Sequence, residues 1–366
     1  MNILLAGGGT AGHINPAIAI AKNIRKKYPD ANILFIGTKR GMETELVPRE
    51  GFELKCIRVR GFKRKLSLEV FITLKELFQG IMEARKLIRE FKPDIVIGTG
   101  GYVCGPVVLS ASRLKVPTLI HEQNALPGIT NKLLSRVADI TAISFRDSKR
   151  YFKGAKRLEY TGNPIRCEMF SIDRNSARRK LEIGNDEKLV VIFGGSLGAK
   201  RINEAVVDMI KKYYKRTDCR IIFGTGRHQF NDVMEMIASF KPDTVEVLPY
   251  IYDMATVMRA ADIIVCRAGA ITVSELTALG TPSILIPSPN VTANHQEYNA
   301  RALEKEGASI VLLEKDLNGL SLYNRIISIL TDREKLKLMS ENSKKIGITN
   351  AADNIYSLVK ELINKS

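Results

Sequence analysis

The first half of the chain alternates short runs of hydrophobic residues with longer amphipathic stretches. The runs are continuous and rich in β-branched residues, and they predict buried strands at residues 2–6, 32–36, 94–97, 118–120 and 140–143. The stretches between them repeat hydrophobic positions with helical spacing and predict helices at residues 16–27, 42–50, 68–90 and 131–137. Continuous hydrophobic strands that alternate with helices indicate a parallel sheet covered on both faces.

The same alternation starts again after Asn163-Pro164 and a charged connector at residues 171–179. This half predicts strands at residues 189–193, 220–224, 244–249, 263–266, 283–287 and 309–313, and helices at residues 201–214, 231–240, 254–260, 272–279, 296–305 and 320–330. We therefore expect an α/β chain of two Rossmann-like, doubly wound domains that face a common cleft, residues 1–163 and residues 164–366. A last helix at residues 353–363 could pack on either domain.

The composition adds an excess of positive charge. The chain has 56 Lys and Arg against 39 Asp and Glu, a formal net charge of +17 at pH 7. Such an excess favours an anionic partner, which could be nucleic acid, a phosphorylated substrate or an acidic membrane surface. The five cysteines form no C-x-x-C pair, which argues against a zinc module or a disulfide scaffold. No run of about 20 hydrophobic residues is present, and the N-terminal run is too short for a signal peptide, so we expect a cytoplasmic protein that does not span a membrane.

The first predicted strand leads into a glycine-rich loop at residues 7–12, which satisfies G-x-G-x-x-G. Glycines between a strand and a helix let the backbone turn tightly and offer N–H groups to a phosphate. A dinucleotide site would also need an acidic residue at the end of the second strand, but that strand ends in Gly37-Thr38-Lys39, so NAD is disfavoured. The alternative is that the glycines only allow the helix to pack closely on the sheet.

His13 follows this loop at the expected start of the helix. The positive end of a helix disfavours a charged imidazolium, which keeps the ring neutral and able to accept a proton near pH 7. His13 is therefore a candidate general base that acts on a hydroxyl. The alternative is that it only caps or orients the loop.

Further loops carry polar groups at predicted strand ends. Residues 98–106 form a second glycine loop, the His-Glu-Gln-Asn segment at residues 121–124 follows another strand, and residues 194–199 repeat the glycine pattern, with Ser196 adding a hydroxyl. We expect His121 to be a buried histidine with satisfied hydrogen bonds rather than a catalytic one.

In the second half of the chain, the segment at residues 266–275 has the most candidate ligand-binding groups. A strand ends there and a helix is expected to start at about Thr272, so the backbone amides of residues 270–272 could hold a phosphate. Glu275 could accept hydrogen bonds from sugar hydroxyls, or it could be a carboxylate that caps the helix. The next loop, residues 294–297, adds side-chain amides suited to a sugar.

Seven segments together resemble glycosyltransferase family 28, and within it the bacterial enzymes that add N-acetylglucosamine to lipid I of peptidoglycan synthesis. The resemblance covers nearly the whole chain and departs from the common pattern at Ala11, where glycine is frequent, and at Ala268, where serine is common. The segments are Gly8-Gly9-Thr10-Ala11-Gly12-His13, Gly100-Gly101-Tyr102, His121-Glu122-Gln123-Asn124, Gly162-Asn163-Pro164-Ile165-Arg166, Gly194-Gly195-Ser196-Leu197-Gly198-Ala199, the run from Arg267 to Glu275, and His295-Gln296.

The resemblance implies the GT-B architecture and an inverting transfer of N-acetylglucosamine from UDP-N-acetylglucosamine to the muramyl C4 hydroxyl of lipid I, which forms lipid II. It implies that His13 is the candidate base and that Gly100, Gly101 and Tyr102 lie on the acceptor side. Within the donor set, Ser196 and the amides of residues 270–272 suit the diphosphate, Glu275 the ribose, Ile251 the uracil, and Gln296 and Asn124 the sugar. The full donor set is Thr10, Ala11, Gly12, Asn124, Arg166, Ser196, Ile251, Ala270, Ile271, Thr272, Val273, Ser274, Glu275 and Gln296.

No D-x-D triplet occurs in the sequence, so we expect no metal and no other cofactor, with helix dipoles and Arg166 holding the leaving UDP. The resemblance implies UDP-N-acetylglucosamine, undecaprenyl-linked lipid I, an anionic membrane surface and other cell-wall synthesis proteins as partners, and a peripheral place on the cytoplasmic face of the bacterial membrane. A nucleotide-sugar epimerase is the first alternative. A non-catalytic RNA-binding protein is the second, but with 7% aromatic residues and no RNA-binding motif we expect no nucleic-acid partner.

Residues 62–92 are the predicted membrane-docking surface. Between Lys55 and Lys92 the chain has eleven Lys or Arg and four Glu, a net charge of +7. A hydrophobic stripe beside basic residues is typical of a helix that rests in an anionic lipid interface, although an ordinary core helix with a solvated basic face would give a similar pattern. The docking candidates are Lys63, Arg64, Lys65, Phe71, Leu74 and Phe78.

Overall fold

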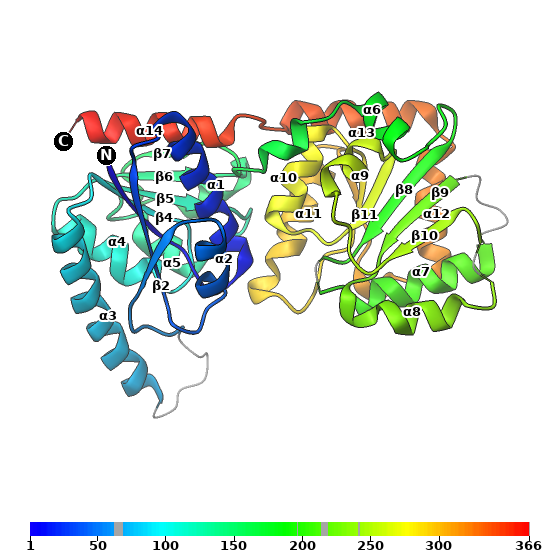
Figure 1. Ribbon diagram of the computed structural model, residues 1–366. Coiled ribbons are helices and arrows are strands. Elements are labelled where there is room, and N and C mark those ends of the chain that lie inside the picture. Colours follow the sequence, from blue (N-terminus) through cyan, green and yellow to red (C-terminus); the bar gives the residue numbers. More distant parts are fainter. Residues whose placement is uncertain (62–68, 196, 214–218, 241, 366) are drawn as a thin grey trace. The chain divides into compact units, whose positions relative to one another are not determined.

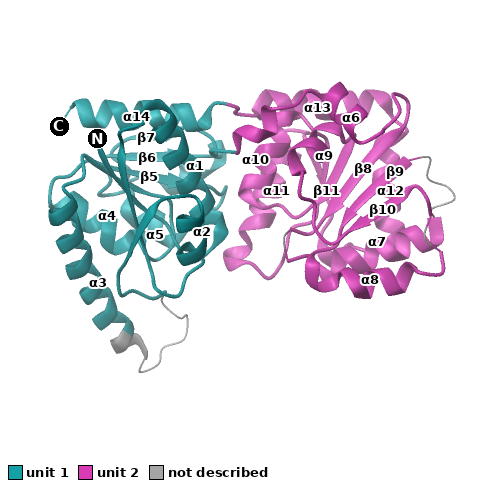
Figure 2. Ribbon diagram, viewed as in Figure 1, with its two compact units in different colours: residues 1–165, 350–366 teal, residues 166–349 magenta. Residues whose placement is uncertain are grey.

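The computed structural model describes residues 1–61, 69–195, 197–213, 219–240 and 242–365, and for residues 69–72 the backbone alone. The chain divides into two compact units (Figure 2). Unit 1 comprises Met1–Ile165 together with Asn350–Ser366, and unit 2 comprises Arg166–Thr349. No helix among the described residues is both long and hydrophobic enough to cross a bilayer.

Unit 1 is built on a parallel sheet of seven strands in the order β3-β2-β1-β4-β5-β6-β7 (Figure 1). The strands are β1 (Asn2–Ala6), β2 (Asn32–Gly37), β3 (Glu53–Cys56), β4 (Ile95–Gly98), β5 (Thr118–Glu122), β6 (Ile140–Ile143) and β7 (Leu158–Tyr160). The helices are α1 (Ala11–Lys27), α2 (Glu43–Arg49), α3 (Glu69–Phe91), α4 (Cys104–Arg113), α5 (Ile129–Leu134) and α14 (Ala351–Asn364).

Unit 2 has a parallel sheet of six strands in the order β10-β9-β8-β11-β12-β13. The strands are β8 (Lys188–Phe193), β9 (Cys219–Gly224), β10 (Val245–Leu248), β11 (Ile263–Cys266), β12 (Ser283–Leu285) and β13 (Ser309–Val311). The helices are α6 (Arg174–Lys180), α7 (Lys200–Tyr213), α8 (Phe230–Ile237), α9 (Met254–Ala260), α10 (Ala270–Leu279), α11 (His295–Lys305), α12 (Gly319–Leu330) and α13 (Arg333–Ile346). Short 3-10 turns lie at Arg146–Tyr151, Cys167–Phe170, Arg227–Gln229, Thr292–Asn294 and Glu314–Asp316.

The sheet of unit 1 is buried on both faces, as the continuous hydrophobic runs predict. In β1, Ile3 and Leu5 pack into the core that includes α1 and α14, whereas Leu4 and Ala6 pack into the core that includes α3 and α4. Successive side chains of a strand point to opposite faces, so a strand covered on both sides needs hydrophobic residues at every position. The expectation of a doubly wound α/β fold is confirmed.

Several elements differ from the sequence-based expectation. Helix α1 begins at Ala11 rather than residue 16, with Pro16 inside it, and α10 begins at Ala270 rather than Thr272. Helices α4, α6 and α13 were not expected. A Gly-Pro pair opens α4, whereas α6 and α13 are dominated by charged and polar residues, so their hydrophobic periodicity is weak.

The chain returns from unit 2 to complete unit 1 with α14. Ile355 and Val359 are fully buried in the core shared with α1. Two ion pairs also join α14 to the rest of unit 1. Lys27 at the end of α1 pairs with Asp353 at 2.8 Å, and Arg157 just before β7 pairs with Glu361 at 2.6 Å. This helix therefore belongs to unit 1 by packing, although it follows unit 2 in the sequence.

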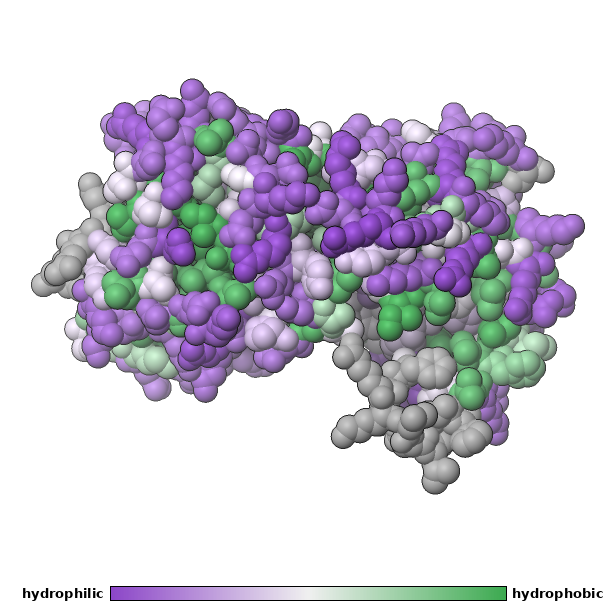
Figure 3. Space-filling view, turned by 180° about the vertical axis from the view of Figure 1, so that it is seen from behind, coloured by the Kyte–Doolittle hydropathy of each residue, from purple (hydrophilic) through white to green (hydrophobic). Residues whose placement is uncertain are grey.

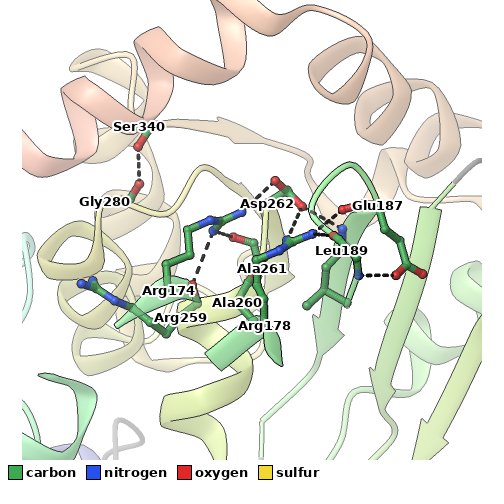
Figure 4. Close-up of polar contacts among 11 residues, drawn as sticks. Arg174, Arg178, Glu187, Leu189, Arg259, Ala260, Ala261, Asp262, Gly280 and Ser340 are labelled. Atoms are coloured by element: carbon green, nitrogen blue, oxygen red, sulfur yellow. Dashed lines mark hydrogen bonds and ion pairs between the residues drawn. The ribbon is translucent and has the colours of Figure 1, made fainter. Parts of the chain in front are cut away.

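In unit 2, a buried arginine ties α6 to the sheet (Figure 4). The Arg178 guanidinium donates to the backbone oxygens of Ala260 (3.1 Å) and Gly184 (2.6 Å) and to the Asp262 carboxylate (3.2 Å). Asp262 in turn accepts from the backbone N–H of Leu189, at the start of β8, at 2.8 Å. The buried cation thus satisfies acceptors from the loop before β8 and from the segment before β11.

Replacing Arg178 by Met should lower the free energy of unfolding of unit 2 by about 3 kcal/mol, because the buried carbonyl oxygens and Asp262 lose their charged donor. Arg179→Met is the matched control. Arg179 is exposed on the same helix and donates only to the Ser176 hydroxyl among the described residues, so it should cost less than about 0.5 kcal/mol. Urea titrations of both variants measure the difference, and equal shifts would contradict the role given to Arg178.

Candidate functional site

Each sheet has one point at which the strand order reverses, between β1 and β4 in unit 1 and between β8 and β11 in unit 2. Helices leave in opposite directions there, and the loops after the two strands open a crevice in which α/β proteins bind ligands. The glycine loops singled out from the sequence follow these strands. We therefore describe the two reversal points in turn.

In unit 1 the loops after β1 and β4 lie in backbone contact. A Cβ atom added to Gly101, which has φ +82°, would lie 2.2 Å from the carbonyl oxygen of Gly8. A Cβ on Gly9 would lie 3.0 Å from the ring of Tyr102. Only glycine allows this approach, and it brings the acceptor-side candidates Gly100, Gly101 and Tyr102 against the first glycine loop.

A buried carboxylate, which the sequence did not point to, holds the first loop. Glu43 at the start of α2 is fully buried and accepts from the N–H of Gly9 at 3.2 Å, and from the N–H and hydroxyl of Thr38 at 2.9 and 2.8 Å. The Gly9 amide is therefore directed to a carboxylate of the protein itself. An acidic residue seven positions after the end of the second predicted strand was the only signal for this contact.

His13 lies in the first turn of α1 and packs against the second loop. Its ring is so close to Gly100 that a Cβ there would lie 2.7 Å from Nδ1. The backbone oxygen of His13 accepts from the Thr99 hydroxyl at 2.8 Å, and its Nδ1 lies 3.1 Å from Oε1 of Gln123. The ring is thus in contact with Gln123 and Gly100, the backbone of His13 is held by Thr99, and the residue is only partly buried.

His121 and Gln123 are buried side by side at the end of β5. Gln123 Nε2 lies 3.0 Å from His121 Nδ1, and His121 Nε2 lies 3.0 Å from the backbone oxygen of Gly162. Complete burial lowers the pKa of His121 to about 4. The expectation of a buried, satisfied His121 agrees with this geometry.

Asn124, from the expected donor set, is anchored by the neighbouring carboxylate. Glu122 accepts from the N–H and the side-chain amide of Asn124 at 2.9 and 3.2 Å, and from the Asn131 amide at 2.8 Å. Thr10, Ala11 and Gly12 lie at the start of α1 in the same unit. Unit 1 therefore brings together His13, the two glycine loops and the segment that follows β5.

In unit 2, helix α10 begins directly after the turn that follows β11. Gly269 is its N-cap residue and no acidic residue occupies its first turn. The turn is held by Asn299, which donates to the backbone oxygen of Ala268 at 3.1 Å, and by Arg267, which donates to that of Ile286 at 3.2 Å. The uncapped start of a helix presents backbone N–H groups and a positive dipole end, which suits a phosphate.

Glu275 lies in the second turn of α10 and does not cap it. The side chain of Glu275 is 5% exposed, and its Oε1 accepts a hydrogen bond from Arg166 at 3.1 Å. The side chain of Arg166 is 56% exposed. Burial raises the pKa of Glu275, and the Arg166 guanidinium partly offsets this. The Glu275 carboxylate is therefore held in an ion pair with the half-exposed Arg166 and does not stabilise the start of the helix.

The other expected donor contacts of unit 2 are spread along the same sheet. Ile251 follows β10 with a buried side chain, and Gln296 Oε1 accepts from the Ser288 N–H at 2.9 Å. Ala293 and Asn294, just before Gln296, both have left-handed backbones with φ near +55°, an uncommon geometry for a residue other than glycine. Ser196 lies outside the described residues. Residues Ile271, Thr272, Val273 and Ser274 complete the first turns of α10.

The docking candidates lie on and before α3. Leu74, Phe78 and Met82 are exposed by 48%, 67% and 52% and follow one another at intervals of four, so they share one face of the helix. Lys63, Arg64, Lys65 and the side chain of Phe71 lie outside the described residues. Figure 3 shows hydrophobic side chains on the part of the surface that α3 forms.

Among the residues with described positions, no three His, Cys, Asp or Glu side chains lie together so that they could hold a metal ion. The charged and polar groups of the two reversal points are instead a histidine, two buried carboxylates and arginines.

Two doubly wound units, each with a glycine loop after the strand at its reversal point, form the GT-B architecture of enzymes that act on nucleotide sugars. The sequence model of the glycosyltransferase family 28 N-terminal domain matches residues 3–143, and that of the family 28 C-terminal domain matches residues 189–355. The chain belongs to glycosyltransferase family 28.

Relatives match the chain over nearly its full length. A protein of Acetivibrio thermocellus is 58% identical over 99% of this chain and 98% of its own, and one of Ruminiclostridium cellulolyticum is 52% identical over 99% and 100%. Both are named UDP-N-acetylglucosamine--N-acetylmuramyl-(pentapeptide) pyrophosphoryl-undecaprenol N-acetylglucosamine transferase.

Solved structures agree with the architecture. MurG of Acinetobacter baumannii superposes with a TM-score of 0.81 at 28% identity, over 98% of this chain and 99% of its own. A UDP-GlcNAc 2-epimerase from Neisseria meningitidis, at 17% identity and a TM-score of 0.66 over the full length of both chains, shares the fold alone. Epimerases and transferases therefore differ in their sites and not in their architecture.

The low pKa of His121 predicts that stability depends on pH. Below pH about 6.5 the unfolded chain takes up a proton at His121, whereas the folded chain does so only near pH 4. The contribution of His121 to stability is therefore fully present above pH about 6.5 and is lost as the pH falls toward 4. From pH 7 to pH 5 the loss should be about 2 kcal/mol. Urea titrations should show that His121→Gln, although less stable at pH 7, loses less of its stability over this range; parallel curves would contradict the assignment.

Proposed function

We propose that the chain transfers N-acetylglucosamine from UDP-N-acetylglucosamine to the C4 hydroxyl of the muramyl residue of undecaprenyl-linked lipid I, forming lipid II. The observation that carries this proposal is the match to the transferases of this name over 99% of the chain. The two units supply what the reaction needs, which is a proton acceptor beside open glycine loops and a cationic, helix-end site for a diphosphate.

His13 acts as the base in this mechanism. It takes the proton of the acceptor hydroxyl, whose oxygen then forms a bond to the anomeric carbon while the bond from that carbon to the UDP oxygen breaks. Attack from the face opposite the leaving group turns the α-linked sugar of the donor into a β-1,4-linked product. Gly100 and Gly101 bring the second loop into backbone contact with His13 and the first glycine loop, so the base and both acceptor-side loops lie together.

Unit 2 holds the donor. The first turn of α10 and Arg166 stabilise the charge that develops on the leaving diphosphate, and Ser196 adds a hydroxyl. Glu275 accepts hydrogen bonds from the ribose, Ile251 contacts the uracil through its backbone, and Gln296 binds the sugar. The mechanism requires no metal ion or other cofactor, since protein groups carry the positive charge.

Helix α3 docks the enzyme on the membrane that holds its acceptor. The exposed stripe of Leu74, Phe78 and Met82 lies on the same helix as Lys75, Lys86 and Arg89, which are exposed as well. Hydrophobic side chains that enter the interface and cations that meet anionic headgroups are the two components of peripheral binding. The docked face is on the cytoplasmic side, where the nucleotide sugar is available.

The proposed reaction is tested with labelled UDP-N-acetylglucosamine and a lipid I analogue. The wild type should form the disaccharide, His13→Ala should lower kcat by about 100-fold or more with unchanged donor affinity, and Glu275→Ala should weaken donor binding by about 1–3 kcal/mol. Isothermal calorimetry with UDP-N-acetylglucosamine measures the affinities. Epimerisation of the donor without transfer, or no reaction, would refute the proposal, and equal turnover of His13→Ala and wild type would remove His13 as the base.

Docking is tested by co-sedimentation with neutral and anionic phospholipid vesicles at low and high salt. Changing Leu74, Phe78 and Met82 together to Ser should weaken binding to anionic vesicles at least about tenfold, because the interface loses three hydrophobic side chains. Changing Lys63, Arg64 and Lys65 together to Glu should weaken binding most at low salt, at about 1 kcal/mol for each lost cation.

The matched control changes Met236, Leu320 and Leu338 to Ser. These side chains of unit 2 are exposed by 49%, 50% and 57%, comparable to the α3 stripe, and should not affect binding. Equal losses in the control and the α3 variant, or equal binding of the wild type to neutral and anionic vesicles, would refute docking through α3.

A further inference from the structure

The amide of Gln123 can adopt only one orientation in its buried site. Its Nε2 lies 2.8 Å from the backbone oxygen of Thr99 and 3.1 Å from that of His121. Both atoms are carbonyl oxygens, which accept and cannot donate, so the group that faces them must be the NH2. The amide therefore presents its oxygen, Oε1, to His13, 3.1 Å from Nδ1.

His121 supports the same orientation. Its Nε2 lies 3.0 Å from the backbone oxygen of Gly162 and must carry the hydrogen, so its Nδ1 has a lone pair that accepts from the NH2 of Gln123 at 3.0 Å. A protonated His121 would place an N–H against this NH2 and force the amide to turn. Burial holds the pKa of His121 at about 4 and prevents this at neutral pH.

An oxygen that faces Nδ1 of His13 requires a hydrogen on that nitrogen. A neutral imidazole carries one hydrogen, so Nε2 is left with the lone pair. We infer that Gln123 is a positioning residue that holds His13 in the Nδ1–H tautomer, with Nε2 as the proton acceptor of the transfer reaction. The catalytic part of this inference rests on the proposed function, in which His13 is the base.

The hydrogen-bond partner of His13 is the neutral amide of Gln123. This distinguishes His13 from a histidine whose ring is held by a carboxylate. The nearby carboxylates are engaged elsewhere, Glu43 with Gly9 and Thr38, and Glu122 with Asn124. Within the described residues, Gln123 is the only hydrogen-bond partner of the His13 ring. When Nε2 takes the acceptor proton, the bond from Nδ1–H to Oε1 persists, so the amide does not have to rearrange during the reaction.

The tautomer is measured directly by long-range ¹H–¹⁵N NMR on wild-type protein labelled at histidine. The chain has four histidines, which single His→Gln variants assign. His13 should have Nδ1–H and His121 should have Nε2–H. His295 is the internal reference, because its Nδ1 lies 2.9 Å from the backbone oxygen of Thr292 and must also carry a hydrogen. A His13 with hydrogen on Nε2 at neutral pH would overturn the inference.

The catalytic consequence is tested with Gln123→Met, which keeps the length of the side chain and removes the acceptor. His13 should shift toward the Nε2–H tautomer, and kcat should fall by about 10- to 100-fold with KM for UDP-N-acetylglucosamine within about twofold. Ser144→Ala is the matched control. It removes a buried hydroxyl 3.1 Å from His121 Nε2 without touching Gln123, and should change neither the His13 tautomer nor kcat by more than about twofold.

A double-mutant cycle separates positioning from general stability. In a His13→Gln background, Gln123→Met should lower kcat no further, because Gln123 acts through His13. An equal loss in both backgrounds would overturn the positioning role. Wild-type turnover of His13→Gln would refute the base in the proposed function instead, and with it the catalytic part of the inference. The wild-type spectrum needs no variant, so it decides the tautomer even if Gln123→Met does not fold.

Discussion

The contact between two backbone loops in unit 1 leaves no space for a side chain, and the geometry of the catalytic half depends on it. Gly101 meets the carbonyl oxygen of Gly8 so closely that any Cβ atom would lie 2.2 Å away. This approach places the Thr99 backbone oxygen where Gln123 can reach it and places Gly100 under the ring of His13. The position of the His13 ring thus follows from the absence of side chains on the glycines beside it.

The division of roles between the two reversal points follows from their electrostatics. In unit 1 the Glu43 carboxylate accepts from the N–H of Gly9, and its negative charge makes the first glycine loop less suited to bind an anion. In unit 2 the uncapped start of α10 and the exposed Arg166 provide the positive charge. In the proposed reaction this difference assigns the sugar nucleotide to unit 2 and the deprotonation of the acceptor to unit 1.

The sequence predicted the inner strands of both sheets and the loops after them, because buried parallel strands need hydrophobic residues on both faces and the loops need glycines. It missed β3 and β7, which lie at the edges of the sheet with half-exposed, mixed residues that give no hydrophobic run. His13 was recognisable from its place after the first loop. Its partner was not, since Gln123 lies 110 residues away and the contact depends on how β5 is registered against β4. The role of Glu43 could not be predicted for the same reason, because only the fold shows that its carboxylate accepts from the N–H of Gly9.

The return of α14 to unit 1 has a consequence for how the chain is made. The ribosome synthesises residues 1–165 first, but the hydrophobic side chains of α1 that pack against α14 stay uncovered until Ile355 and Val359 have been made. At roughly 5–20 residues per second this delay is about 10–40 s. During that time the hydrophobic side chains that α14 will cover are exposed to solvent or to a chaperone. Completion of unit 1 therefore waits for translation of unit 2, and a message truncated after residue 349 would yield a unit 1 whose core is partly exposed.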